Sequence, residues 1–491
     1  MGRWLGRLTG LLLVLGGVLA GPAGAAEKPP DPRVSAGERS VEAFVTSWCR
    51  PEGNGLFGCA SLSLVSGFRF PALAAEPGSE VVVDTRLAAT EVGVRSIPQD
   101  GGPAEPTAVA VRRIDERRWA FAMPSSTTRV GFDIAYADGG SSDSVLILRR
   151  IVGATAGPSS VDAYRDVVVW SEREDPPGAE APSYHLVALI DGSARRLPVA
   201  PRSVPFDVDL GPGADWRTVA VYSRCAQEPQ PPYALGDAPS APYPAYTSGR
   251  GCDLYRFDFE TARERKIEGA STDQASEALP SIWRDRIAFA RVYEQRSGKR
   301  GVLPYLYTSD LDGGPSKREP GGARGRTGLP GPTSLDLYGR RLAFVWNHRT
   351  GATGGVTELR LDTLGGGRRV LSSARHDGTD SYATFLSPQG VHGRIVYGYQ
   401  RVGVEYEAVA IPEPDGLHTD AVRITGKSVA SLLLRYRITN GDREALTAPG
   451  QLAGVSTTAR EGLFVAQRSD LLAADGGTTT IVDVSDLVPS G

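Results

Sequence analysis

The feature that most constrains this chain is a pattern repeated six times between residues 160 and 470. Each copy has a turn, a short strand of alternating apolar residues, a polar loop, a second strand and then a basic third strand. The apolar strands occupy 167–170, 219–222, 287–290, 342–345, 395–398 and 463–466. Their starts lie 52, 68, 55, 53 and 68 residues apart, which is typical of β-propeller blades with loops of varying length. The repeat predicts an all-β fold, but a propeller scaffold does not identify an activity.

The remainder of each repeat supports the same interpretation. A partner strand follows each apolar strand, and a short turn then leads to a basic outer strand. The partners are predicted at 185–190, 254–258, 306–310, 358–362, 408–411 and 470–474. Turns such as Asp191-Gly192 suit a tight hairpin because its central residues need positive φ. We expect the propeller to cover residues 161–488.

One strand-like run, at 428–439, has no clear place in this repeat and explains the second interval of 68 residues. It could be the outer strand of the fifth blade or a fragment of a seventh blade. We expect six blades, with seven as the alternative.

Residues 34–152 have a separate all-β pattern. Strands are predicted at 80–84, 91–94, 108–111, 118–121, 130–134 and 145–148, and an earlier one at 61–65 is expected to be the first. The spacing indicates a small β-sandwich with immunoglobulin-like architecture, without the immunoglobulin cross-sheet disulfide. The proline-rich residues 27–33 and the small-residue segment 153–160 are interpreted as linkers.

The first 26 residues have the pattern of an export signal. Arg3 and Arg7 precede an apolar run over 8–20, and the small residues 23–26 offer a cleavage site. The run is too short to span a membrane, and no later stretch approaches about 18 uninterrupted apolar residues. The mature chain is therefore expected to be extracellular or periplasmic, without a membrane span.

The overall charge excludes one broad class of partner. The chain has 54 basic and 57 acidic residues, a net charge of −3. A nucleic-acid binder would need a net basic face, so nucleic acid is not an expected partner.

The four cysteines fall into two pairs that are close in sequence, Cys49 with Cys59 and Cys225 with Cys252. Such spacing predicts two local disulfides in an oxidising compartment. A zinc site is the competing interpretation, but neither pair has the short spacing of a zinc knuckle and no histidine is nearby. No metal or other cofactor is expected.

The segment 306–318, Leu-Tyr-Thr-Ser-Asp-Leu-Asp-Gly-Gly-Pro-Ser-Lys-Arg, is the clearest copy of a pattern in this repeat. The pattern is similar to the WD40-like repeats of the TolB propeller family. The family phrase Ser-Pro-Asp-Gly before the apolar strand is kept only as Ser387-Pro388-Gln389-Gly390. The resemblance covers about 330 residues and implies an exported propeller that serves as a protein-binding platform. It brings no catalytic residues with it.

Motifs for enzymatic chemistry are missing from the sequence. No Gly-x-Ser-x-Gly segment with a following hydrolase domain is found, and the metalloprotease motif His-Glu-x-x-His is absent. The five histidines are scattered singly, at 185, 348, 376, 392 and 418. A glycan lyase or hydrolase with its site in the propeller funnel remains the alternative, and it needs carboxylates, histidines or tyrosines of different blades to converge. Sugar binding without catalysis would need exposed aromatic faces beside polar side chains.

The best candidate for a binding site is an insertion at 227–250, between Cys225 and Cys252. It interleaves six prolines with Tyr233, Tyr243 and Tyr246. Prolines limit the entropy lost on binding, and aromatic rings supply contact area. A surface flap whose tyrosines pack on its own blade is the competing interpretation. We expect a monomeric, non-enzymatic binding protein that recognises a protein or a cell-envelope polymer with one propeller face.

Overall fold

The structure is a computed structural model of the chain. It describes residues 27–51, 57–62, 70–97, 105–156, 159–175, 181–229, 245–293, 303–319, 331–349, 355–376, 381–391, 394–404, 410–412, 418–420, 427–439, 443–445, 459–460, 465–469 and 478–484. The export signal predicted at 1–26 lies outside these ranges, as does the partner strand predicted at 470–474. Within them, no helix is long and apolar enough to cross a membrane.

The chain divides by its internal contacts into two compact units, Met1–Arg149 and Arg150–Gly491. Both units are built almost entirely from antiparallel β-sheets. Each unit is described separately below.

The first unit contains two groups of strands. One sheet has the order β2-β1-β6-β10-β9, formed by Arg39–Glu42, Arg33–Ala36, Glu80–Asp84, Arg118–Ala122 and Arg112–Arg113. The other has the order β12-β11-β7-β8, formed by Ser141–Ala156, Thr128–Tyr136, Ala89–Ile97 and Thr107–Val109. Strands β3 (Phe44–Pro51) and β5 (Ala72–Ala75) also pair with β12, and β4 (Phe57–Ser61) pairs with β3.

The alternation of apolar and polar residues explains which faces of these sheets are buried. In β6, Val81 and Val83 are buried, while Glu80 is exposed. Because strand side chains point alternately to opposite faces, this pattern directs one face of the sheet inward. Side chains of both groups of strands, such as Trp119 and Phe132, share one apolar core.

The start of this unit differs from the expectation. The first strand is β1, not the segment 61–65, of which residues 63–65 lie outside the described ranges. The proline-rich residues 27–33 also pack on the unit: Pro29 and Pro32 are buried, and the Pro32 carbonyl accepts a hydrogen bond from the Ala43 N–H at 2.8 Å. The sequence interpretation treated these prolines as a linker because proline cannot donate to a sheet, whereas here their rings and carbonyls contribute contacts.

The second unit contains five successive sheets, each built around four antiparallel strands. Their orders are β13-β14-β15-β16, β17-β18-β19-β20, β21-β22-β23-β24, β25-β26-β27-β28 and β29-β30-β33-β34. The strands are Val161–Tyr164, Val167–Glu174, Ser183–Ile190 and Ser193–Arg196; Asp209–Pro212, Thr218–Gln227, Arg250–Asp258 and Arg263–Lys266; Ser276–Trp283, Arg286–Tyr293, Leu303–Asp310 and Lys317–Arg318; Gly331–Tyr338, Arg341–Arg349, Gly355–Thr363 and Arg368–His376; Ser381–Val391, Arg394–Val404, Lys427–Arg437 and Arg443–Ala445.

The remaining strands of this unit are short. Strands β31 (Ala410–Pro412) and β32 (His418–Asp420) pair with each other, and β35 (Ala459–Arg460) pairs in parallel with β13. Strand β36 (Val465–Ser469) pairs with β37 (Thr478–Asp483), and β37 pairs with the last residues of β12. One 3-10 turn, η1, covers Tyr246–Ser248.

The first five predicted apolar strands coincide with the second strands of these five sheets. The unplaced run at 428–439 is β33, which pairs with β30 as the third strand of the fifth sheet. The partner predicted for β30 at 408–411 was wrong, since β31 pairs with β32 instead. The long insertion between β30 and β33 displaced the pairing from the position that the repeat predicts.

The linker predicted at 153–160 was also wrong in its first half, because β12 continues to Ala156. Gly153 lies against the indole of Trp170, and a Cβ at this position would stand 3.1 Å from a ring carbon. Gly153 is therefore part of a strand and leaves room for the Trp170 ring of another sheet.

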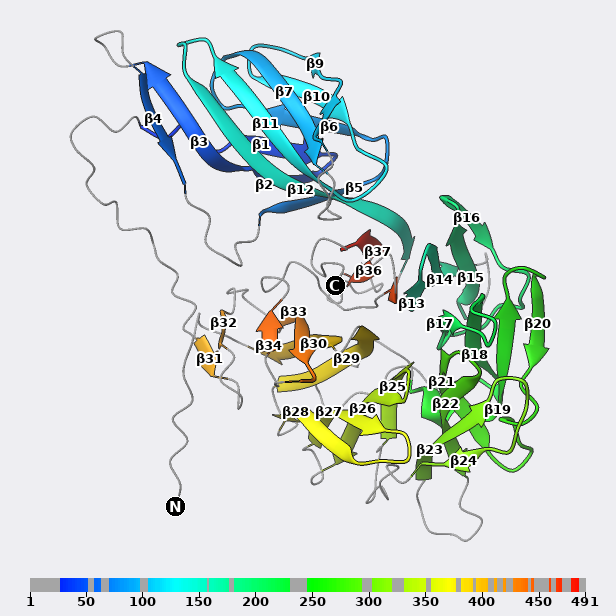
Figure 1. The fold of residues 1–491 in the computed structure, drawn as a ribbon. Coiled ribbons are helices and arrows are strands. Elements are labelled where there is room, and N and C mark those ends of the chain that lie inside the picture. Colours follow the sequence, from blue (N-terminus) through cyan, green and yellow to red (C-terminus); the bar gives the residue numbers. More distant parts are fainter. Residues whose placement is uncertain are drawn as a thin grey trace, which may run out of the picture. The chain divides into compact units, whose positions relative to one another are not determined.

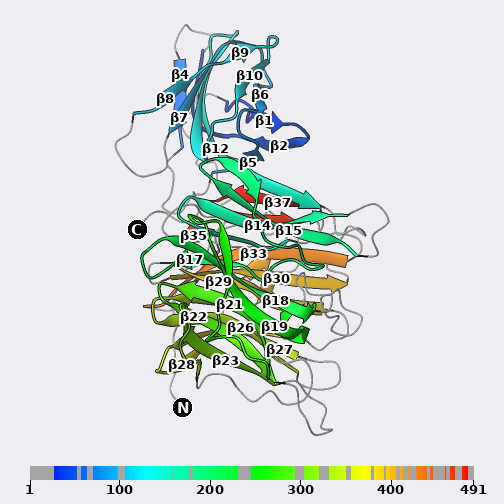
Figure 2. The same cartoon turned by 90° about the vertical axis from the view of Figure 1, so that its right-hand side faces the viewer.

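The five sheets have a propeller-like arrangement. The first strand of each sheet contacts the first strand of the next, in the sequence β13, β17, β21, β25 and β29. Figure 1 shows the sheets of this unit following one another around a ring. Figure 2 shows the same succession after a quarter turn, with the strands of neighbouring sheets stacked.

Hydrogen bonds between these first strands form a series that we call the inter-sheet ladder. In each step, a backbone N–H of one first strand donates to a side-chain oxygen of the preceding first strand. The steps are Leu210 to Asp162, Ile282 to Asp209 at 2.8 Å, Leu337 to Ser281 at 2.7 Å, and Gly390 to Asp336 at 2.6 Å. All four acceptor side chains are buried.

The ladder has a two-residue unit. Each acceptor directly precedes the residue whose N–H donates backward, as in Asp209-Leu210, Ser281-Ile282 and Asp336-Leu337. One such pair therefore connects its own sheet to both neighbours. The Ser281 hydroxyl also donates to Asp209 Oδ2 at 3.1 Å, so a continuous chain of hydrogen bonds crosses three sheets.

We predict that Asp209→Ala lowers the free energy of unfolding by about 1–3 kcal/mol, because it leaves the buried Ile282 N–H without its acceptor. Urea unfolding followed by circular dichroism would measure the loss. Asp166→Ala is the matched control: Asp166 is an exposed turn residue, and its replacement should change the free energy by less than about 0.5 kcal/mol. Equal effects of the two substitutions would contradict a structural role for the ladder.

Candidate functional site

The insertion singled out by the sequence lies between β18 and β19. Its ends are joined by the Cys225–Cys252 disulfide, whose two residues face each other directly in the strand register. Gln227 and Arg250 are the last two residues that pair in the register of these strands. We call this disulfide and the residues that surround it, Arg202, Asp207, Glu228, Gly249 and Arg250, the loop base.

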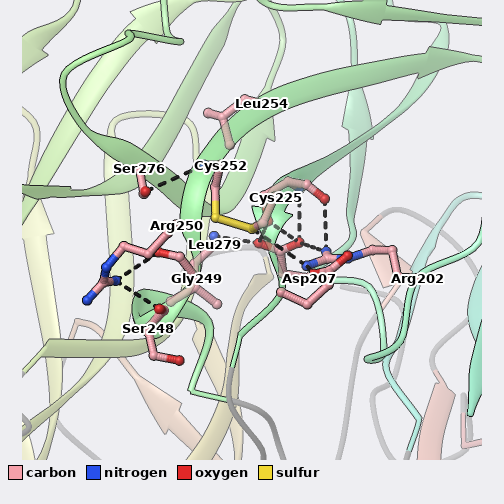
Figure 3. The surroundings of a disulfide bond; sticks show 12 residues. Arg202, Asp207, Cys225, Ser248, Gly249, Arg250, Cys252, Leu254, Ser276 and Leu279 are labelled. Atoms are coloured by element: carbon pink, nitrogen blue, oxygen red, sulfur yellow. Dashed lines mark hydrogen bonds and ion pairs between the residues drawn. A yellow bond between two sulfur atoms is a disulfide. The ribbon is translucent and has the colours of Figure 1, made fainter. Parts of the chain in front are cut away.

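Backbone geometry closes one side of the loop base. A Cβ on Gly249 would lie 2.6 Å from Cys252 Sγ and 2.9 Å from Cys225 Sγ, so only glycine leaves room for the disulfide. The Arg250 guanidinium donates to the carbonyls of Ser248 and Gly249 at 2.8 and 2.9 Å. Figure 3 shows this arginine beside Ser248, the last residue of η1, and Gly249, which follows it.

On the other side, Arg202 connects two carboxylates. Its Nη1 donates to Asp207 Oδ1 at 3.0 Å, and its Nη2 donates to Glu228 Oε2 at 2.6 Å. Only 1% of the Arg202 side chain is exposed. Glu228 lies directly after β18, so this ion pair fixes the chain at the point where the insertion begins.

Asp207 is the centre of the loop base. Its carboxylate accepts hydrogen bonds from the Ser223 N–H at 2.9 Å and from the Leu279 N–H at 2.7 Å, in addition to the bond from Arg202. Leu279 has φ of +54°, an uncommon value for a branched residue, and this backbone conformation belongs to the bulge from which its N–H reaches Asp207. Strain in β21 is therefore tied to the geometry of the loop base (Figure 3).

The loop base joins three sheets. The backbone of Arg202 exchanges two hydrogen bonds with Tyr184 of β15, its guanidinium reaches Ser223 of β18, and Asp207 reaches β21. Burial lowers the pKa of Arg202, but the charges of Asp207 and Glu228 outweigh this effect and the pKa lies above its usual value. The guanidinium therefore stays charged and holds both carboxylates.

Tyr246 is buried at the end of the insertion. It is 5% exposed, it packs among residues of β21 and β25, and its hydroxyl donates to the Pro205 carbonyl at 3.1 Å. An aromatic ring beside a turn can either anchor a loop in the core or extend into solvent. Because the Tyr246 ring is buried, it anchors the end of the insertion. Tyr233 and Tyr243 lie outside the described residues.

The other cysteine pair is a disulfide of the first unit. Cys49 of β3 is joined to Cys59 of β4, and the two residues are again direct partners in the register. Strands β3 and β4 pair antiparallel on either side of residues 52–56, which lie outside the described residues.

Sequence reasoning missed Arg202, Asp207 and Glu228. Charged residues are rarely buried, and their pairing here depends on three sheets coming together, which one sequence does not reveal. Gly249, close before Cys252, was the one local signal that the disulfide is tightly packed.

Three aspartates of the described first strands have a structural role. Asp162, Asp209 and Asp336 are each used as acceptors in the inter-sheet ladder. Among the residues that the structure describes, no group of three or more His, Cys, Asp and Glu side chains is arranged to hold a metal ion.

We predict that Arg202→Met lowers the free energy of unfolding by about 3–5 kcal/mol, since it leaves Asp207 and Glu228 without their cation. Arg196→Met is the control. Arg196 also contacts two carboxylates, Glu172 and Glu174, but its side chain is 49% exposed, and surface pairs of this kind contribute at most about 1 kcal/mol. A loss for Arg202→Met no greater than that of the control, measured by chemical denaturation, would contradict the account of the loop base.

No family model matches the sequence. No curated protein matches it either. Among solved structures, the chain is similar to TolB from Acinetobacter baumannii, with 13% identity over 79% of this chain and 80% of that one and a TM-score of 0.33. It is similar to oligogalacturonate lyase from Vibrio parahaemolyticus, with 10% identity over 83% and 94% and a TM-score of 0.34. It is also similar to the β-propeller domain of the trilobed protease from Pyrococcus furiosus, with 9% identity over 78% and 97% and a TM-score of 0.29.

Proposed function

We propose that this chain is an exported, monomeric binding protein that recognises a protein or a cell-envelope polymer through the insertion between β18 and β19. The observation that carries the proposal is the loop base. A disulfide, the Arg202–Glu228 ion pair and the buried Tyr246 anchor fix both ends of one insertion. So much structure at the ends of one loop is typical of a segment that is presented to a ligand.

Fixed ends lower the cost of binding. A loop whose ends are already ordered loses less conformational entropy when it contacts a partner. Tyr233 and Tyr243 would then supply aromatic contact area between the prolines of the insertion. Tyr246 acts in this proposal as an anchor, in place of the contact role that the sequence suggested.

The proposed scaffold is a six-bladed propeller over 161–488, preceded by a β-sandwich over 34–152. Strands β36 and β37 would form the sixth blade, and the last residues of β12, which precede residue 161 in the chain, would pair with it. Gln389 supports closure of the ring: it occupies the acceptor position of the fifth sheet, it is buried, and its Oε1 has no hydrogen-bond partner within the described part of the chain. A sixth first strand would supply the missing donor.

The proposed location is the periplasm or the cell exterior. Both disulfides suggest export to an oxidising compartment. Residues 1–26 would be the export signal, as their sequence pattern indicates.

Site-specific photo-crosslinking in the producing cell tests this proposal. A benzophenone amino acid in place of Tyr243 should give a discrete adduct with an envelope protein, or a polymer-linked smear. This adduct is expected because, in the proposal, the insertion contacts the ligand directly.

Val370 provides the control position. It is 52% exposed on β28, away from the loop base, and the same amino acid there should give no such adduct. Identical products from positions 243 and 370 would contradict a recognition role for the insertion. So would the absence of any product when the benzophenone amino acid replaces Tyr233 or Tyr243.

A further inference from the structure

The two disulfides occupy equivalent places in their sheets. Cys49 is the direct register partner of Cys59 between β3 and β4, as Cys225 is of Cys252 between β18 and β19. Thiol–disulfide exchange begins when a thiolate attacks one sulfur of the bond, so its rate depends on access to that sulfur. A difference in reactivity between the two bonds must then come from their surroundings.

The surroundings enclose the Cys225–Cys252 bond. Cys252 is 1% exposed. A Cβ on Gly249 would stand 2.6 Å from one sulfur and 2.9 Å from the other, and Arg202 Nη2 lies 4.0 Å from Cys225 Sγ. The protein itself therefore occupies much of the space that an attacking thiolate would need (Figure 3).

The Cys49–Cys59 bond lies at the surface. Cys59 is exposed, and Cys49 is half-buried. Along β4, exposed residues alternate with half-buried ones, so Phe57, Cys59 and Ser61 share the solvent-facing side of the strand. Phe57, two residues before Cys59, is 61% exposed. A thiolate can therefore approach Cys59 Sγ from solvent.

Strand β4 has few other attachments within the described part of the chain. It pairs there with β3 alone, whereas β3 also pairs with β12 (Figure 1). Residues 57–61 do not contribute to the apolar core of the first unit. Breaking the disulfide would thus loosen β4 while the core stays packed, as is typical of segments with low local stability.

We propose that the Cys49–Cys59 disulfide is a thiol-exchange site that is reduced by a dithiol protein. Exposed disulfides are the labile ones, whereas enclosed disulfides are structural. The exposed Phe57 ring lies on the same side of β4 as the bond and offers contact area that a protein partner can use and a small thiol cannot.

The reaction consists of two exchanges. A thiolate of the partner attacks Cys59 Sγ, the S–S bond breaks, and Cys49 leaves as a thiolate that takes up a proton. The second thiol of the partner then loses its proton and attacks the partner's sulfur in the mixed disulfide, which releases Cys59 as a thiolate that is protonated in turn. Two electrons pass from the partner to the cysteine pair, and the partner is left with a disulfide. In the reduced chain, no covalent bond holds β4 to β3.

Reduction of the folded chain followed by alkylation tests the access to each bond. The mature chain is incubated with dithiothreitol, blocked with iodoacetamide and digested for mass spectrometry. Cys49 and Cys59 should be alkylated at least about tenfold faster than Cys225 and Cys252, which serve as a control within the same molecule. In enough guanidinium chloride to unfold the chain, the two pairs should react at similar rates, because their surroundings no longer differ.

Trapping tests the protein partner and the direction of attack. The probe is a thioredoxin whose second active-site cysteine is replaced by serine, so that the mixed disulfide persists. It should form one adduct with the folded chain, through Cys59. Phe57→Ala should slow formation of the adduct about threefold and leave reduction by dithiothreitol unchanged. Val370→Ala is the matched control: it removes an apolar side chain that is 52% exposed in the second unit, and it should alter neither rate.

Several outcomes would overturn the proposal. Equal alkylation of the two pairs in the folded chain would refute the assignment of the site. An adduct through Cys49 would contradict the direction of attack, and reduction by dithiothreitol without any trapped adduct would exclude the protein partner. Loss of the β-sheet circular dichroism signal on selective reduction would show that the effect is not confined to β4. The site lies in the first unit, so these results are independent of the recognition role proposed for the insertion between β18 and β19.

Discussion

The second unit depends on the inter-sheet ladder. A sheet of four strands buries its faces against its neighbours, but apolar packing alone does not fix how neighbouring sheets are aligned. A buried carboxylate or hydroxyl that accepts a hydrogen bond from one specific backbone N–H does fix this alignment. If one sheet shifted along its neighbour, both groups would be buried and unpaired. Asp162, Asp209, Ser281 and Asp336 apply this constraint at four successive boundaries. In the sequence, each acceptor directly precedes the residue whose N–H donates to the preceding sheet. The same arrangement recurs from one sheet to the next.

A scaffold aligned in this way leaves the two ends of its strands free for other purposes. At one end, the loop base uses Arg202 and Asp207 to join three sheets beneath an insertion. At the other end, the turns carry Trp216 and its neighbours. The same sheets thus support a polar, hydrogen-bonded anchor at one end and contacts between aromatic rings at the other. Both features contain residues with positive φ, Leu279 and Trp216, which the surrounding packing must hold in place.

Much of the fold could be predicted from the sequence, because strand alternation is a local signal. The apolar strands at 167–170 and 219–222 lie within β14 and β18, and both cysteine pairs are disulfides. The failures came where local signals mislead. Gly153 was read as flexibility, although it makes room for the ring of Trp170. The run at 428–439 was left unplaced because a long insertion separates β33 from its partner β30.

The candidate sites were less predictable for a physical reason. Tyr246 looked like a contact residue, since a sequence does not tell whether a ring in a loop points outward or into the core. The partners of Arg202 lie on different strands. Trp216, Trp283 and Tyr338 belong to three sheets, and their rings are in contact only because those sheets stack. The sequence also did not predict that aspartates of the first strands accept hydrogen bonds from neighbouring sheets.

Hydrogen exchange at single amides tests the role of the ladder most directly. The N–H groups of Leu210, Ile282 and Leu337 cross a boundary between sheets, so they can exchange only when neighbouring sheets separate. Native-state exchange in increasing urea should therefore give these amides the same opening free energy as global unfolding of the second unit. Opening free energies well below the global value, with exchange that is independent of urea, would show that the boundaries open locally and would contradict a ring held together by the ladder.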